Sequence, residues 1–299
     1  NSITLNNKHR FSLFYLLIIP VSILTLIKCE TVDITYVPIN NNRSAIDHAY
    51  ECEETLGPLP KFSCDDAIEV PTTKNGIQLN SDSSNYLDCD HPWAFGMACQ
   101  TGNKVGRYQG INSDGSENLD VVFITFCRDG GLGVIGHKLS TGETCFFSIL
   151  DGVENNNLPT PGESGYNEKW MTPSAVAADQ CVNCHMSSPF LHTPAVDQLQ
   201  HPQIPDELLV PLTGNTPYSV IGEEFRQPFN VNIQNSCTTC HRPQCTEQFQ
   251  NYPLDELVMP PPFENITQFD HSEISQVDRQ AIRDWCQTLG LGSFTGSGD

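Results

Sequence analysis

The most continuous apolar segments of the chain are short and lie in its middle third. Residues 121–126 read Val-Val-Phe-Ile-Thr-Phe, and residues 144–149 read Thr-Cys-Phe-Phe-Ser-Ile. Both runs are rich in β-branched and aromatic residues, a composition that is typical of strands. Glycine-containing turns at residues 129–131 and 141–142 lie between them. The pattern predicts a small β module within residues 91–150.

The segments on either side of this module give different signals. Residues 31–90 are rich in Asn, Ser, Asp and Pro and predict extended segments and turns, and residues 151–168 predict a linker. Beyond residue 170 the pattern becomes helical in short pieces. Thr172 and Pro173 form an N-cap followed by a proline at the first helical position, which predicts a helix that leads to Cys181.

The clearest helix signal lies near the C-terminus. Residues 275–278 read Ser-Gln-Val-Asp, a capping box in which Asp replaces the usual Glu or Gln, and Gly290 marks the end of the helix. Its apolar face comprises Ala281, Ile282, Trp285 and Leu289. Together the signals predict a mixed α+β fold that is loop-rich and disulfide-stapled, with a β-rich region over residues 30–160 followed by a short-helix domain over residues 161–299.

Residues 1–29 carry the features of an export signal. Residues 8–10 read Lys-His-Arg, and residues 11–27 are apolar apart from Ser, Thr and one Pro. This apolar stretch is short for a membrane span, so a secretory signal peptide is the first interpretation and an uncleaved N-terminal anchor is the alternative. We therefore expect an exported protein with a periplasmic, cell-surface or extracellular location.

The charge of the chain excludes one class of partner. There are 36 acidic and 15 basic residues, and the formal net charge is −21 at pH 7. Such an acidic surface repels the phosphate backbone of nucleic acid, whereas it attracts basic protein surfaces and steers association with them. We therefore expect protein partners with basic surfaces and no nucleic-acid partner.

The cysteine content points to disulfides. Of the 13 cysteines, Cys29 belongs to the leader and four belong to the two motifs described below. The remaining eight form an even set, which in an exported chain indicates a disulfide framework. We expect pairing between cysteines that are close in sequence, namely Cys52–Cys64, Cys89–Cys99, Cys127–Cys145 and Cys245–Cys286.

Two copies of the pattern C-x-x-C-H carry the chemistry of the chain. They are Cys181, Cys184 and His185, and Cys237, Cys240 and His241. Two thiols three residues apart on one helical turn can both bond the vinyl groups of a haem, and the adjacent His can then bind the iron. Zinc or a redox dithiol would use the same residue types, but the His recurs directly after the second Cys, and export disfavours a zinc–thiolate site. We therefore expect two covalently bound haems c.

The region from about 165 to 290 resembles the c-type cytochromes, in particular small multihaem ones. The resemblance depends on the two motifs and on Met259, which precedes two prolines and the helix with Trp285, as at the end of many monohaem cytochrome c domains. It implies that residues 161–299 form a dihaem cytochrome c domain. It also implies that Met259 is a distal iron ligand of the second haem.

Each iron needs a sixth ligand if it only transfers electrons. His137 lies on a predicted turn between two strands, a position that can direct a side chain into a shared pocket. His192 is too close in sequence to His185 to bind the same iron from the other side. We expect His137 at the first haem and His192 at the second, with Met259 and His201 as alternatives.

These residues predict an extracytoplasmic carrier that passes electrons between redox partners. The two motifs are close enough in sequence for the haems to share one pocket, and haem contacts between copies could assemble such units into an extracellular filament. The alternative is a dihaem enzyme such as a peroxidase, which requires one iron with an open or displaceable sixth position. In a further alternative, the β-rich half binds a ligand or partner and the haem half is an electron outlet.

Overall fold

The computed structural model describes residues 43–93, 99–128, 130–179, 181–185, 187–213 and 216–228, together with positions 281, 284, 285 and 288. The expected leader, the second C-x-x-C-H motif, Met259 and most of the C-terminal helix lie outside these residues. Within the described part of the chain, no helix is both long and apolar enough to cross a membrane.

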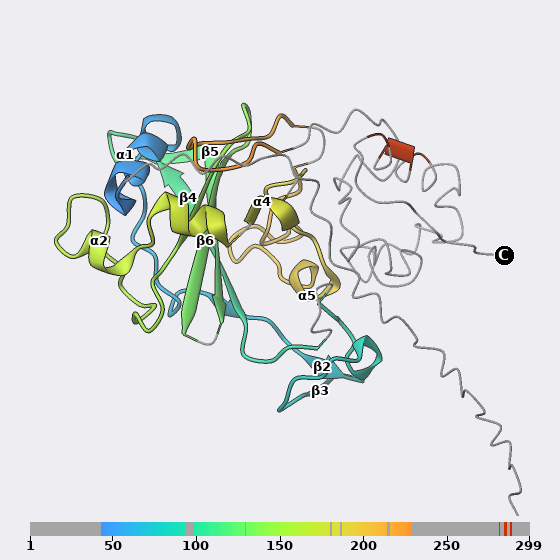
Figure 1. Cartoon of the computed structure of the whole chain (residues 1–299). Coiled ribbons are helices and arrows are strands. Elements are labelled where there is room, and N and C mark those ends of the chain that lie inside the picture. Colours follow the sequence, from blue (N-terminus) through green and yellow to red (C-terminus); the bar gives the residue numbers. More distant parts are fainter. Residues whose placement is uncertain are drawn as a thin grey trace, which may run out of the picture. The chain divides into compact units, whose positions relative to one another are not determined.

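The architecture is mixed α/β and is organised around one six-stranded sheet (Figure 1). Its strands, in spatial order, are β1 (Ile68–Glu69), β4 (Lys104–Ile111), β5 (Glu117–Arg128), β6 (Gly131–Lys138), β7 (Glu143–Ser148) and β8 (Ser219–Val220). A separate hairpin pairs β2 (Thr73–Lys74) with β3 (Ile77–Gln78). The helices are α1 (Ala45–Leu56), the 3-10 turn η1 (Tyr86–Asp88), α2 (Tyr166–Lys169), α3 (Pro173–Ala178), α4 (Cys181–Cys184) and α5 (Pro194–Asp197).

Strands β4 to β7 form an antiparallel meander, and β8 adds in parallel beside β7. The β5–β6 register runs from Val121 opposite Lys138 to Arg128 opposite Gly131. The two apolar runs of the sequence form the central part of β5 and most of β7, so the strand predictions are confirmed. The predicted helix start is confirmed as well, because Thr172 caps α3 and Pro173 is its first residue.

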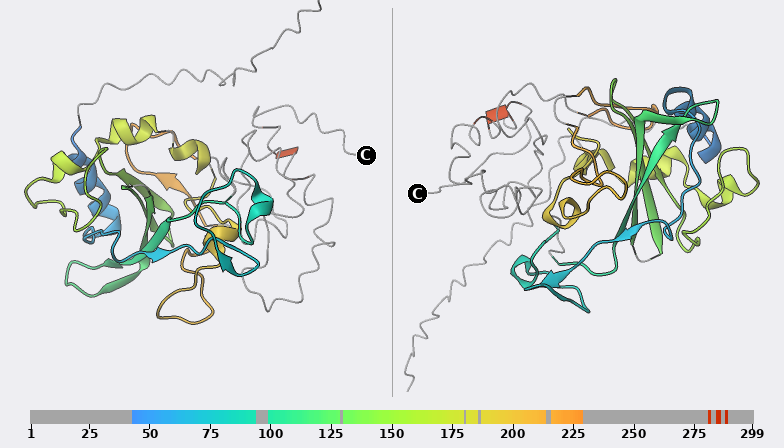
Figure 2. Two further views of the ribbon diagram at one scale, coloured as in Figure 1. Left: turned by 90° about the horizontal axis from the view of Figure 1, so that it is seen from below. Right: turned by 180° about the vertical axis from the view of Figure 1, so that it is seen from behind.

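Both faces of the sheet are buried, which explains why the apolar runs are nearly continuous rather than alternating. One face, here called the first face, carries Phe123, Val134 and Phe147 and packs against α1 and Trp170. The opposite, second face carries Val122 and Phe146 and is covered by side chains from residues 176–225. Figure 1 shows α1 and α2 on the left of the sheet and α4 and α5 on its right, and the rear view in Figure 2 agrees.

Helix α1 corrects the prediction that residues 31–90 contain only extended segments and turns. Ser44 and Asp47 form a reciprocal capping box at its N-terminus, which satisfies backbone N–H groups that the helix leaves unpaired. Its buried positions are Ala45, His48, Ala49, Cys52 and Leu56, which recur at helical spacing. The helix is therefore held by its cap and by an apolar stripe against the first face, although its residue composition is that of a loop-rich segment.

The disulfide pairing differs from the expectation in two of the three described bridges. The bonds are Cys52–Cys145, Cys64–Cys127 and Cys89–Cys99, so only the last was predicted correctly. The expected Cys127–Cys145 bond is wrong because β6 separates the two strands, which places them about 10 Å apart, beyond the Cα–Cα range of a disulfide. The expected Cys245–Cys286 bond lies outside the described residues.

Candidate functional site

The first C-x-x-C-H motif forms a single helical turn at the second face of the sheet. Cys181 and Cys184 are the first and last residues of α4, and the backbone N–H of His185 donates to the carbonyl of Cys181 at 2.8 Å. The sulfur of Cys181 is half-buried and donates to the carbonyl of Val176 on α3 at 3.5 Å. The spacing of the motif is therefore realised as one turn, the arrangement that its chemistry requires.

The side chain of His185 lies against an apolar cluster on this face. Its ring contacts the ring of Phe146 on β7, with centroids 5.5 Å apart. The hydroxyl of Tyr218 donates to the carbonyl of His185 at 2.8 Å, which fixes the end of α4. The members of the cluster are Phe146, Val176, Val182, Tyr218, Val220 and Phe225. Burial lowers the pKa of His185 to about 4, so the imidazole is neutral at neutral pH, the form that binds metal ions.

His137, the expected distal ligand of the first haem, lies fully buried in β6 rather than on a turn. It is opposite Thr144 on β7. Its Nδ1 is 2.8 Å from the Thr144 hydroxyl oxygen, and that hydroxyl donates its own proton to the carbonyl of Gly142 at 3.1 Å. With its proton directed to Gly142, the hydroxyl accepts from His137, which favours the neutral tautomer that carries the proton on Nδ1.

His137 and His185 are directed to the same side of the sheet. Thr144 and Phe146 are two residues apart on β7, so their side chains lie on one face about 7 Å apart along the strand. His137 is bonded to the first of these residues and His185 packs on the second. The structure therefore brings the motif histidine and its expected distal partner to neighbouring positions on the second face.

His192, the expected distal ligand of the second haem, shows a similar arrangement just before α5. Its Nδ1 is 2.7 Å from the Asp197 carboxylate, and both side chains are buried. The carboxylate can only accept, so Nδ1 is protonated, and in the neutral form of the ring Nε2 is the nitrogen with the lone pair. The same pairing of a carboxylate with a histidine orients metal-binding histidines in other proteins.

His201, the alternative distal ligand, has the opposite tautomer. Its Nδ1 accepts from the backbone N–H groups of Gln203 and Ile204, each at 3.1 Å. Nε2 therefore carries the proton in the neutral ring. Partial burial and the positive charge of Arg107 lower its pKa. His201 is therefore less suited than His137 or His192 to bind iron through Nε2.

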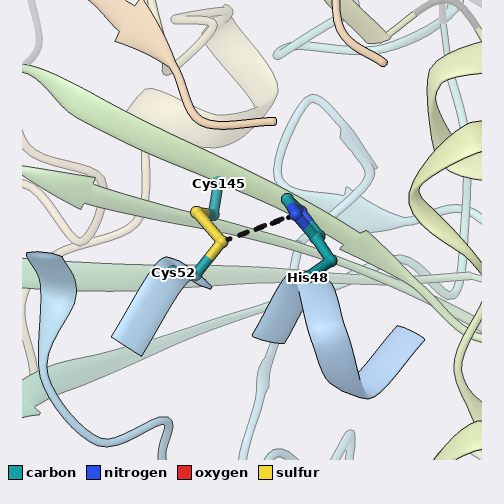
Figure 3. Close-up of side chains that lie close together, drawn as sticks. All are labelled: His48, Cys52 and Cys145. Carbon is teal, nitrogen blue, oxygen red and sulfur yellow. Dashed lines mark hydrogen bonds between the residues drawn. A yellow bond between two sulfur atoms is a disulfide. The ribbon is translucent and has the colours of Figure 1, made fainter. Parts of the chain in front are cut away.

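A second cluster of metal-binding residue types, which the sequence did not reveal, lies on the first face (Figure 3). His48 and Cys52 are one turn apart on α1, and Cys145 on β7 forms the disulfide with Cys52. The ring nitrogens of His48 lie 3.7 and 3.9 Å from the Cys52 sulfur. Burial, followed by the positive charge of Arg43, lowers the pKa of His48 to about 4. The helical spacing of His48 and Cys52 would have been informative only if α1 had been predicted.

The remaining expected site residues are Cys237, Cys240, His241 and Met259, which lie outside the described residues. Comparison of the chain with protein-family models, with curated proteins and with solved structures finds no match. The functional argument therefore depends on the residues of this chain and their geometry.

Proposed function

We propose that the protein is a c-type cytochrome that binds two haems covalently and transfers electrons between redox partners. The observation that carries the proposal is the first motif, where Cys181, Cys184 and His185 lie on one helical turn against the second face. The second motif repeats the residue pattern in the sequence. The bound iron would supply the electron-transfer chemistry by gaining and losing one electron.

The surroundings of His185 suit a haem. A porphyrin is a large apolar disc, and the cluster around Phe146, Val182 and Phe225 offers apolar side chains beside the motif. The ring is neutral because burial lowers its pKa, so no proton has to be removed before it binds iron. Cys181 and Cys184 would form the thioether bonds and His185 would bind the iron.

His137 is the residue that we propose as the distal ligand of this haem. The hydrogen bond between its Nδ1 and the Thr144 hydroxyl would orient the ring, as the outer hydrogen bonds of metal-binding histidines do. His192 is our proposal for the second haem, with Asp197 in the role of Thr144. A ring that is hydrogen-bonded to a carboxylate is a more basic ligand than a free one.

Two protein ligands on each iron favour electron transfer over the peroxidase alternative. An enzyme of that class needs an open sixth position, whereas His137 and His192 are the protein ligands that we propose for the two sixth positions. The net charge of −21 favours docking on basic partner surfaces. The three disulfides of the described residues agree with export to an oxidising compartment.

The test is expression of the chain in a host that matures c-type cytochromes. We expect a reduced-minus-oxidised haem spectrum and a mass gain of two porphyrins. Replacing Cys181 and Cys184 together by Ser is expected to remove one porphyrin, and the same change at Cys237 and Cys240 is expected to remove the other.

The matched control replaces Cys89 and Cys99 together by Ser, which removes a disulfide and should leave both porphyrins in place. Colourless protein, or a mass gain that is unchanged by either motif variant, would contradict the proposal. Binding of cyanide or peroxide by the oxidised protein would favour the enzyme alternative.

A further inference from the structure

The side chains of His48, Cys52 and Cys145 bring three metal-binding groups close together. One ligand atom from each residue lies within 4.8 Å of the others, and all three side chains are buried. Within the described residues, this is the single group of three or more His, Cys, Asp or Glu side chains that meets this geometry. In Figure 3 the ring of His48 points towards the sulfur of Cys52, beside the bond to Cys145.

One imidazole and two thiolates form a donor set for a soft or borderline metal ion. Zn²⁺ takes Cys sulfur and His nitrogen ligands, whereas Mg²⁺ and Ca²⁺ prefer oxygen. Two thiolates also neutralise the charge of a divalent ion, which matters here because a net charge in a buried site is costly. The His48 ring is already neutral, since burial lowers its pKa, so it can donate its lone pair without losing a proton.

The two sulfur atoms are held near each other by more than their own bond. Cys52 and Cys145 have Cα atoms 6.2 Å apart, and two sulfurs bound to one tetrahedral Zn²⁺ lie about 3.8 Å apart. Helix α1 stays on the sheet through its buried apolar stripe and through the ion pair of Arg43 with Glu224, at 3.1 Å. The cysteines should therefore remain neighbours when their bond is broken.

Glu51 gives His48 a second polar partner. Its carboxylate oxygen lies 3.7 Å from Nδ1 of His48 and is also paired with Arg43. A carboxylate near Nδ1 favours the tautomer in which Nε2 holds the lone pair, as at known histidine–metal sites. Nε2 is also the ring nitrogen nearer to the Cys52 sulfur, at 3.7 Å against 3.9 Å for Nδ1.

We infer that His48, Cys52 and Cys145 form a zinc-class metal site that becomes available when the Cys52–Cys145 disulfide is reduced. In the reducing step, a dithiol gives two electrons and two protons to the disulfide and itself becomes a disulfide. The metal ion then replaces the two thiol protons, which pass to solvent. The oxidised and the metal-bound forms exclude each other. The inference does not depend on the haems.

The test measures how fast each cysteine reacts with N-ethylmaleimide in the full chain, read by peptide mass spectrometry. The disulfides are first opened with a water-soluble phosphine, which takes up the oxygen of water as each disulfide gains two hydrogens. Zn²⁺ is then added in several-fold excess over all cysteines. We expect zinc to slow the labelling of Cys52 and Cys145 together by at least tenfold.

Cys64 and Cys127 are the matched control within the same molecule. They are also buried and also form a disulfide between the segment after α1 and the sheet, so zinc should leave their labelling rates unchanged. Equal slowing of both pairs would mean that zinc only stabilises the fold and would overturn the inference. Unchanged rates for Cys52 and Cys145 would overturn it as well.

The variant His48→Gln tests the third ligand. Its zinc affinity at Cys52 and Cys145, obtained from the labelling rates at increasing zinc, is expected to fall at least tenfold. Before reduction the variant should still contain the Cys52–Cys145 disulfide, which shows that α1 is in place. If the variant does not fold, the comparison of the two cysteine pairs in the unaltered chain still decides the question. Unchanged zinc affinity in a folded variant would remove His48 from the site.

Discussion

The two faces of the sheet are covered in different ways. The first face is covered by α1, which has twelve residues and a full capping box, and the disulfides Cys52–Cys145 and Cys64–Cys127 attach its cover to the sheet. The second face is covered by helices α3, α4 and α5, which have six, four and four residues. Helices this short are not stable on their own, so their position depends on packing.

This difference suggests how the two faces divide their roles. Disulfides attach the cover of the first face to the sheet, whereas the second face carries the C-x-x-C-H turn with His185, together with the buried His137. Under the proposed function, thioether bonds to a haem would attach the cover of the second face, as disulfides do on the first. The functional groups would then lie on the second face, whose covering helices are attached through the cofactor.

The largest expected effect concerns the Cys52–Cys145 disulfide, which attaches α1 to the first face. Replacing both Cys52 and Cys145 by Ala should lower the free energy of unfolding by about 3.5–4 kcal/mol, because the bond spans 93 residues, 63 of which are already bridged by Cys64–Cys127. The same change at Cys89 and Cys99, separated by 10 residues, should cost about 3 kcal/mol. Denaturant unfolding under non-reducing conditions measures both. Equal losses for the two variants would mean that loop length does not determine how much each disulfide contributes to the free energy of unfolding.

A smaller effect compares the two sides of a single strand, β6. A Cβ at Gly136 would lie 2.5 Å from the Phe123 ring and 2.9 Å from Leu56, on the first face. Gly136→Ala should therefore cost about 1–3 kcal/mol of unfolding free energy through overpacking. In Gly133→Ala the new Cβ has its nearest contact at 4.0 Å, so that variant should be close to neutral. A neutral Gly136→Ala would show that the first face is less tightly packed than described.

The hydrogen bond that holds His137 can be tested on the second face. Thr144→Val removes the acceptor of the His137 Nδ1 proton, which should cost about 1–3 kcal/mol because a buried donor is left unpaired. Thr144→Ser keeps the hydroxyl and is the control for the lost bond. Thermal or denaturant unfolding measures both variants. If His137 binds haem iron, Thr144→Val should also shift the visible spectrum, and Thr144→Ser should not.

The last expected effect is a pH dependence on the first face. His48 has a pKa of about 4 in the folded protein against a usual value of 6.5, so the unfolded chain takes up its proton first as the pH falls. Its contribution to stability is therefore present above pH 6.5 and is lost between pH 6.5 and 4, at up to about 1.4 kcal/mol per pH unit. His48→Gln lacks this proton, so its unfolding free energy should fall less steeply over this range. Parallel curves for the two proteins would contradict the assigned burial effect.

The strands and the motif could be predicted from the sequence because their signals are local. The residues of β5 and β7 are β-branched or aromatic in unbroken runs, and Thr172 with Pro173 marks the start of α3. Helix α1 was missed because Asn, Ser and Pro dominate the wider segment. The capping pair Ser44 and Asp47 and the apolar spacing from Ala45 to Leu56 were nevertheless present.

The sequence by itself determined which reactive groups the chain contains: two C-x-x-C-H motifs, an even set of further cysteines and an excess of acidic residues are properties of residue type and spacing. Only the tertiary structure decided which cysteines pair and which histidines share a face. Cys145 could not be paired with Cys52 from the sequence, because their contact depends on how α1 packs across the sheet. Likewise, His137 lies beside Thr144, on the face where His185 contacts Phe146, because β6 and β7 pair in one particular register and α4 packs on that face. Contacts between residues that are far apart in the sequence depend on how the helices and strands pack. The spacing of residues in the sequence indicates only contacts within one helical turn or one strand.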